Sequence, residues 1–389
     1  MTKIKSLLIR IYRKIYNSKY RWLYILCISF FFLILTFVAN LNTSNQTFIQ
    51  LYSDVIVRNC KVEKYSSICY GNHLSWANQI FGFKLTLKLL KTIQIKDFQA
   101  NHCHSIAHKI AQSEIQKNPG KWLSFFKQLE DPYMCFTGFI HGAIEGKKRF
   151  DPKLVLDKPI FEKMCQDIIN EINQKNPYPC AHALGHVLLV EQHADLSKSI
   201  NICQSLSTGL QRGCLDGLFM ELILKTNLAA HGLVWPQKIT DSYVKEIESI
   251  CANYDGNTAE SCWREISQAY YMLEGPDLIK LKNHCQHGGN NENIKACYFR
   301  SFNFSLVDKK FDHSQLSELC SDYANNEDDI YNCYDWAITG LILTSPKYIP
   351  MISELCNKAP ATFYDSCWKM KEERLKMYSH VGSSPVAKD

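Results

Sequence analysis

The cysteines recur at a regular spacing along most of the chain, and this spacing limits the possible folds. Twelve of the seventeen form successive couples, each separated by 11 to 15 residues: Cys165/Cys180, Cys203/Cys214, Cys251/Cys262, Cys285/Cys297, Cys320/Cys333 and Cys356/Cys367. The second member of each couple returns after steps of 34, 48, 35, 36 and 34 residues. A period near 35 residues is typical of two-helix repeats that stack into a solenoid. The spacing therefore predicts an all-α fold of helical hairpins.

The last couple shows the layout expected of one repeat. An apolar segment ends at Cys356, a polar stretch with Pro360 and Asp365 follows, and Cys367 opens the next segment. Proline and aspartate favour turns, so this stretch is the expected loop of an αα-hairpin. A disulfide across so short a loop would stabilise its hairpin by about 2–3 kcal/mol in the chain-entropy model.

Four cysteines in the first half of the body do not follow this regular layout. Cys60 and Cys69 are expected to close a small hairpin. Cys103 and Cys135 each open an apolar helix, but neither has a partner cysteine at the end of the preceding helix. Two outcomes stay open for them: a bridge between adjacent hairpins, or free thiols.

The period and hairpin layout over residues 70–378 resemble tetratricopeptide or Sel1-like repeat proteins, including their disulfide-stapled exported versions. The tryptophan-leucine-glycine-tyrosine pattern of tetratricopeptide repeats is not reproduced. The resemblance therefore implies a stacked-hairpin fold and a tendency to bind a protein or peptide partner. It implies no functional residue.

The N-terminus reads as a membrane anchor. Residues 1–21 carry seven basic residues and no acid, and residues 22–39 carry no charge. An uncharged run of this length can cross a bilayer as a helix, whereas the apolar core of a cleaved signal peptide, which is the alternative, is usually shorter. Basic residues stay cytoplasmic, so we expect a single-pass protein whose body lies outside the cytoplasm. An even set of sixteen cysteines beyond the anchor is consistent with an oxidising compartment.

The remaining chain divides by composition. Residues 40–58 read as a polar stalk, 59–230 as N-terminal repeats, 231–378 as C-terminal repeats, and 379–389 as a disordered tail. Without the seven basic residues at the N-terminus, the chain has 37 basic and 38 acidic residues. A nearly neutral body argues against a nucleic-acid partner.

In the N-terminal repeats, several expected helices begin at a cysteine. Histidines and acids recur at equivalent positions of these helices. Residues four apart lie on one helix face, and stacked repeats place such faces side by side. The sequence therefore predicts one patch of metal ligands: His104, His108, His141, His182, His186 and Asp216. Glu145 and Glu221 are expected in the same patch, as ligands or as a general base.

Imidazole and carboxylate ligands suit a divalent transition metal such as zinc, copper, iron or manganese. The first hypothesis is a metal-dependent hydrolase, with a copper oxidase as a variant. The alternative is a non-catalytic scaffold that binds a protein or peptide, in which the histidines pack and hydrogen-bond between helices. The sequence contains no phosphate-binding loop, no dinucleotide fingerprint and no nucleophilic-serine motif.

Overall fold

The computed structural model describes residues 46–61, 66–97, 100, 103–129, 135, 137–151, 153–172, 176–225, 238–306, 320, 326–344 and 348–377. These described residues form helices and no strand, which confirms the all-α class. No helix within the described ranges has the length and apolar character that a membrane crossing requires. The predicted segments 1–21 and 22–39 and the tail 379–389 lie outside the described residues. So do residues 226–237, which belong to an insertion within the 48-residue step of the cysteine spacing.

The structure describes sixteen α-helices and two 3-10 helices within these ranges. In chain order they are α3 (Gln46–Cys60), α4 (Ser66–Phe81), α5 (Phe83–Lys96), α6 (His104–Lys117), the 3-10 helix η2 (Pro119–Gln128), α7 (Gly138–Phe150), α8 (Lys158–Ile172), α9 (Tyr178–Glu191), α10 (Leu196–Ser205), α11 (Thr208–Leu224), α13 (Asp241–Cys251), α14 (Gly256–Glu274), α15 (Leu278–Cys285), the 3-10 helix η3 (Gln286–Gly288), α16 (Asn291–Ser305), α18 (Glu327–Thr344), α19 (Ile349–Asn357) and α20 (Tyr364–Met377).

Helix α3 corrects the predicted stalk, because residues 46–58 are helical and packed. Ile49, Ser53, Ile56 and Cys60 are buried along one face of α3. Their spacing of three and four residues puts them on a single helical stripe. The helix packs on α4 and α5. Its buried stripe is short and includes the polar Ser53, so the sequence pattern did not predict a helix here.

Eight disulfides cross-link the described helices. All six predicted couples pair as expected, and so do Cys60 and Cys69. The open question over Cys103 and Cys135 is answered by a bridge between them, which closes a loop of 32 residues. This bridge ties the start of α6 to the residues just before α7. It therefore fixes the relative position of two helices that carry candidate site residues.

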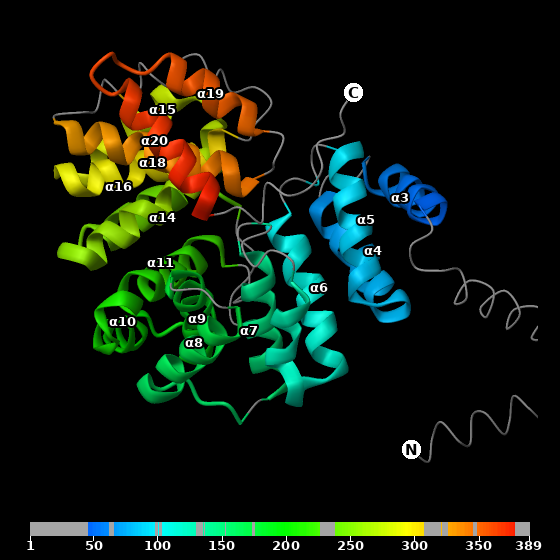
Figure 1. The fold of residues 1–389 in the computed structure, drawn as a ribbon. Coiled ribbons are helices and arrows are strands. Elements are labelled where there is room, and N and C mark those ends of the chain that lie inside the picture. The colour runs from blue at the N-terminus through cyan, green and yellow to red at the C-terminus, as the bar shows by residue number, and fades with distance from the viewer. Residues whose placement is uncertain are drawn as a thin grey trace, which may run out of the picture.

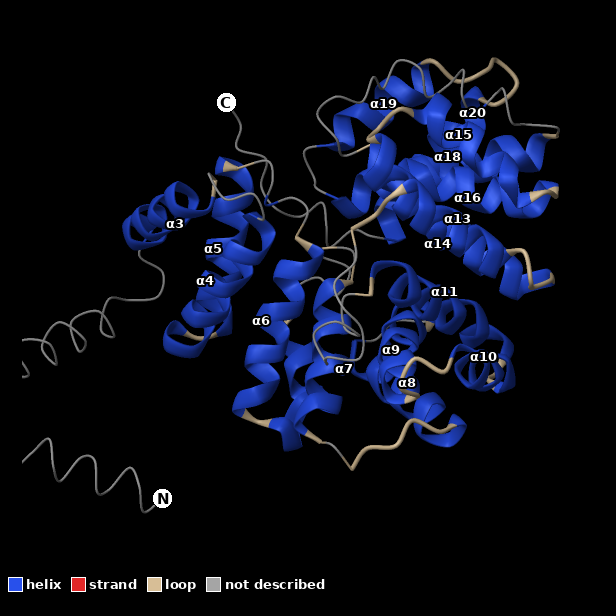
Figure 2. Ribbon diagram, turned by 180° about the vertical axis from the view of Figure 1, so that it is seen from behind, coloured by secondary structure: helices blue, strands red, loops and turns tan. Residues whose placement is uncertain are grey.

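Eight helices, which we call the B helices, pack against one another in chain order: α6, α7, α9, α11, α14, α16, α18 and α20. The intervening helices α8, α10, α13, α15 and α19 each pack beside the B helix that follows them. Figure 1 shows the colour changing from cyan to red along this succession, and Figure 2 shows the same order from behind. Helices α11 and α14 pack directly on each other, so the B helices continue across the undescribed insertion.

Two pairs of B helices approach especially closely, and glycines make this possible. A Cβ atom at Gly142 of α7 would lie 2.5 Å from the Cα and carbonyl oxygen of His108 on α6. A Cβ at Gly217 of α11 would clash with the backbone of His182 on α9. Glycine in a helix costs about 1 kcal/mol relative to alanine, so close packing must compensate at both positions. The backbone of α6 is therefore held against α7, and that of α9 against α11.

Candidate metal centre

Five imidazoles gather on three neighbouring B helices. His104 and His108 come from α6, His141 comes from α7, and His182 and His186 come from α9. The His141 ring centroid lies 4.7 Å from that of His104 and 5.0 Å from that of His182. All five histidines predicted from the sequence are therefore brought together. They form two groups whose possible ligand atoms lie within 4.8 Å of one another, and His141 belongs to both.

The pair on α6 has its outer nitrogens already committed. His108 Nδ1 lies 3.0 Å from Glu145 Oε2, and His104 Nδ1 lies 3.2 Å from the carbonyl oxygen of Cys135. Both partners only accept hydrogen bonds, so each neutral imidazole must carry its proton on Nδ1. Each Nε2 then presents a lone pair. These two Nε2 atoms face each other at 2.9 Å.

The pair on α9 repeats much of this arrangement. His186 Nδ1 lies 3.2 Å from Glu221 Oε2, which leaves the Nε2 lone pair of a neutral His186 directed inward. That Nε2 lies 3.2 Å from His182 Nε2. His182 Nε2 also lies 3.4 Å from the sulfur of Met220. His182 Nδ1 is buried without a hydrogen-bond partner among the described residues.

His141 lies between the two pairs and is almost fully buried. Its Nε2 lies 3.3 Å from the hydroxyl oxygen of Thr137, one helical turn earlier. Its Nδ1 is also buried, and no described residue forms a hydrogen bond with it. Buried polar atoms normally have a partner, so two imidazole nitrogens without a described partner make this cluster a candidate ligand site.

Burial favours the neutral form of His104, His141 and His182. Desolvation, followed by the positive charge that neighbouring histidines would carry, lowers the pKa of His104 to about 3. The same two causes hold the pKa of His141 well below its usual range. For His182, desolvation again comes first, and His186 and Arg300 lower the pKa further. Neutral imidazole is the form that binds metal ions.

The two glutamates predicted as catalytic groups each contact a histidine. Glu145 Oε2 accepts hydrogen bonds from His108 Nδ1 and from Gln112 Nε2, the latter at 2.8 Å. Glu221 contacts His186 and is 1% exposed. A carboxylate on Nδ1 fixes the tautomer and the orientation of a metal-binding histidine. Their contacts therefore give both glutamates a positioning role.

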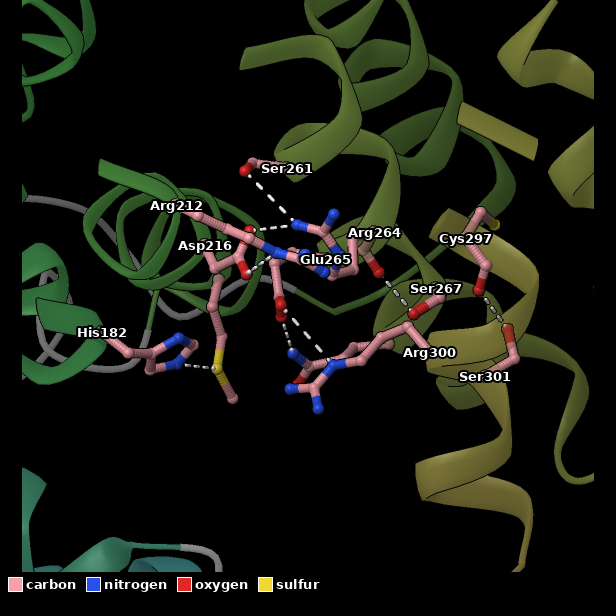
Figure 3. A network of polar contacts seen from close by, with 12 residues as sticks. His182, Arg212, Asp216, Ser261, Arg264, Glu265, Ser267, Cys297, Arg300 and Ser301 are labelled. Carbon is pink, nitrogen blue, oxygen red and sulfur yellow. Dashed lines mark hydrogen bonds and ion pairs between the residues drawn. The ribbon is translucent and has the colours of Figure 1, made fainter. Parts of the chain in front are cut away.

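Asp216 does not join the histidines, which corrects its prediction as a ligand. One of its oxygens accepts a hydrogen bond from Tyr178 at 2.7 Å, and the other accepts one from Arg264 at 2.6 Å. Arg264 is 1% exposed and also contacts Glu260. A buried guanidinium needs a carboxylate partner, and Arg264 lies 48 residues after Asp216. Figure 3 shows Asp216 turned toward Arg264, with His182 to the left of this pair.

Several residues around the histidines have roles that the sequence did not indicate. Gln112 continues the four-residue spacing of His104 and His108 and supports Glu145. Tyr178 continues the spacing of His182 and His186 in the other direction, and it holds Asp216. The recurrence of polar residues at this interval is a signal that could have identified both. Thr137 contacts His141 from one helical turn earlier.

Two other groups of possible ligands lie apart from the five histidines. Cys60, Cys69 and His73 are close together, but both cysteines are oxidised in a disulfide and cannot act as thiolate ligands. Glu248, His284 and His287 form the other group, in which hydrogen bonds join His287 to Glu248 and His284 to Glu274. Ordinary hydrogen bonds account for this second group.

No protein-family profile matches the chain, and no curated protein matches it either. The chemistry of the five histidines is therefore interpreted from their own geometry.

Proposed function

We propose that this protein is a membrane-anchored, disulfide-stapled helical solenoid that holds a divalent transition metal on its N-terminal B helices. The observation that carries the proposal is the geometry of His104 and His108. Each Nδ1 faces an acceptor, and the two Nε2 atoms approach to 2.9 Å. Two lone pairs at this distance repel, so a cation is needed beside them.

The cation could be a proton or a metal ion, and the surroundings favour a metal. A proton shared between His104 and His108 would make a buried imidazolium beside three further imidazoles. A proton shared in the same way between His182 and His186, whose Nε2 atoms are 3.2 Å apart, would place a second positive charge close by. Burial disfavours both charges and they repel each other. A metal ion instead uses the lone pairs of neutral histidines.

The nitrogen separations fit coordination to one ion within each pair. Metal–imidazole bonds are about 2.0–2.1 Å long. Nitrogens that are 2.9 Å apart then subtend about 90° at the ion, and nitrogens 3.2 Å apart subtend about 100°. Both angles are common in tetrahedral to octahedral sites. A donor set of imidazoles suits zinc, copper or iron better than the harder manganese.

The best-supported catalytic role for such an ion is hydrolysis by a metal-bound water. Three histidines leave coordination positions open in zinc hydrolases, and His104, His108 and His141 would do the same here. The His108 side chain is 17% exposed, whereas that of His186 is 7% exposed. We therefore place the water and substrate side of the centre at α6. Glu145 would hold the His108 ring while the reaction takes place.

The extracytoplasmic location is part of the same proposal. Eight disulfides are consistent with folding in an oxidising compartment, as expected for the body of an anchored exported protein. The proposal includes the membrane anchor that the sequence predicts at residues 22–39. The alternative of a scaffold that binds a protein or peptide becomes the conclusion if the folded body binds no metal.

Cobalt titration tests the proposed centre. The body, residues 46–377, is produced by secretion, freed of metal with a chelator and titrated with Co²⁺, whose visible absorption reports nitrogen coordination. We expect saturable uptake that a His104→Ala/His108→Ala variant reduces strongly. A His284→Ala/His287→Ala variant is the matched control and should bind like the unaltered protein. Unchanged uptake in the first variant, or no uptake by the folded protein, would overturn the proposal.

A further inference from the structure

The geometry points to a centre of two metal ions joined by His141, an inference that rests on the proposed function. One ion would be held by His104 and His108, the other by His182 and His186. His141 would bind one ion through each of its ring nitrogens. The site would therefore bind two first-row transition-metal ions, with His141 as the bridging imidazolate.

The two histidine pairs are too far apart to share one ion. Ligand atoms on one metal lie at most about 4.2 Å apart, which is twice the length of a metal–nitrogen bond. The groups within 4.8 Å of one another are His104, His108 and His141, and His141, His182 and His186. Among the described residues no such group contains members of both pairs. A single ion would therefore leave one of the two histidine pairs without a metal.

Each pair also has its own supporting structure. His108 is oriented by Glu145 from α7, and His186 is oriented by Glu221 from α11. The glycines at 142 and 217 bring each supporting helix against the helix that carries the histidines. The α6–α7 pair and the α9–α11 pair therefore share this arrangement of glycine, glutamate and histidine. Two metal-binding pairs would each use such a carboxylate–histidine contact.

His141 is placed to serve both ions. Its ring is nearly equidistant from His104 and His182, and it also lies 5.4 Å from His108 and 5.6 Å from His186. Its Nδ1 is buried without a hydrogen bond to any described residue. Thr137, which contacts Nε2, has a left-handed backbone with φ of 62°. Such strain is stored where a side chain must be placed accurately.

Binding of the two ions releases one proton, which comes from His141. A neutral His141 offers one lone pair and carries one N–H. The first ion takes the lone pair, and the second displaces the N–H proton, which leaves to solvent. The product is an imidazolate between two divalent ions. No oxidant or other reactant is needed.

Copper loading of the residues 46–377 body tests this inference. The chelator-treated protein is loaded with Cu²⁺, and bound copper and protein are quantified. We expect two copper ions per chain in the unaltered protein and one in each double variant, His104→Ala/His108→Ala and His182→Ala/His186→Ala. An imidazolate couples two Cu²⁺ spins, so the electron paramagnetic resonance signal should be much smaller than two independent ions give. His141→Gln, with its fold checked by circular dichroism, should restore independent spins.

The outcomes separate the two proposals. One copper per chain that either double variant removes would refute the two-ion centre and leave the metal site standing. Two copper ions with independent spins in the unaltered protein would refute the His141 bridge. A folded protein that binds no copper would overturn the proposed function itself. The same holds if both double variants still bind two copper ions per chain.

Discussion

The close approach of α6 and α7 gives a prediction whose size follows from the structure. In Gly142→Ala, the new Cβ would lie 2.5 Å from His108 Cα, whereas ordinary contact begins at 3.4 Å. The two helices must then separate by about 0.9 Å, because the obstructing atoms are backbone. Overpacking of this kind costs about 1–3 kcal/mol. Alanine also gains up to about 1 kcal/mol of helix propensity, so the net change in stability alone is a poor measure.

A matched control isolates the packing cost. Gly209 lies on α11, and a Cβ there would meet only the Pro177 side chain at 3.7 Å, an ordinary contact. Gly209→Ala gains a similar propensity term without the clash. The difference in unfolding free energy between the two variants should therefore be about 1–3 kcal/mol. Equilibrium urea unfolding with the disulfides intact measures this difference.

Gly142→Ala should also weaken the metal site. Moving α6 from α7 would lengthen the 3.0 Å contact between His108 and Glu145 to almost 4 Å if the shift lay along that contact. Loss of an outer carboxylate contact typically lowers metal affinity by about 10–100-fold. Competition with a metallochromic chelator measures the affinity. If Gly142→Ala matches Gly209→Ala in both stability and affinity, the account of the α6–α7 contact is refuted.

Three further predictions test separate parts of the site. Asp216→Asn should destabilise the fold by up to about 3–5 kcal/mol, because Arg264 loses its buried carboxylate partner and keeps only the more exposed Glu260, while the metal content stays unchanged; a lost metal ion would show that Asp216 is a ligand after all. Cys103→Ser/Cys135→Ser should cost about 4 kcal/mol in urea unfolding and lower metal affinity, because the carbonyl of Cys135 contacts His104. Cys356→Ser/Cys367→Ser, the control, should cost about 3 kcal/mol and leave metal affinity unchanged, so equal affinities in the two variants would contradict the role of Cys135. Glu145→Gln should lower metal affinity about 10–100-fold without changing the number of ions bound, and a variant that binds fewer ions would identify Glu145 as a direct ligand.

Much of the fold could be predicted because disulfide-linked hairpins mark the sequence at fixed intervals. The six later couples and Cys60–Cys69 were predicted from their separations. The Cys103–Cys135 bridge could not be fixed, because it spans 32 residues and joins helices of adjacent hairpins. Helix α3 was missed because its buried stripe contains only two aliphatic residues, Ile49 and Ile56. The spacing of cysteines therefore predicts disulfides within one hairpin, but it does not predict a disulfide between residues far apart in the chain.

The five histidines could be predicted because residues four apart share a helix face and successive helices align those faces. The partners of each side chain could not. Asp216 occupies an equivalent position, yet its carboxylate is engaged by Arg264 from the next B helix and by Tyr178. Glu145 and Glu221 lie in the predicted patch, but contact with the outer nitrogens of His108 and His186 makes them positioning groups. Such roles depend on distances between helices, which no pattern in one sequence records.

Elemental analysis of the body as purified is the most direct test of the central claim, which is that the five histidines hold a transition metal. Residues 46–377 would be secreted by cells grown with trace zinc, copper and iron, and purified without a chelator or a histidine tag. We predict at least one tightly bound transition ion per chain, lost when His104, His108, His182 and His186 are all replaced by alanine. A folded, disulfide-bonded protein that carries no metal, or that keeps its metal after these four replacements, would contradict the account.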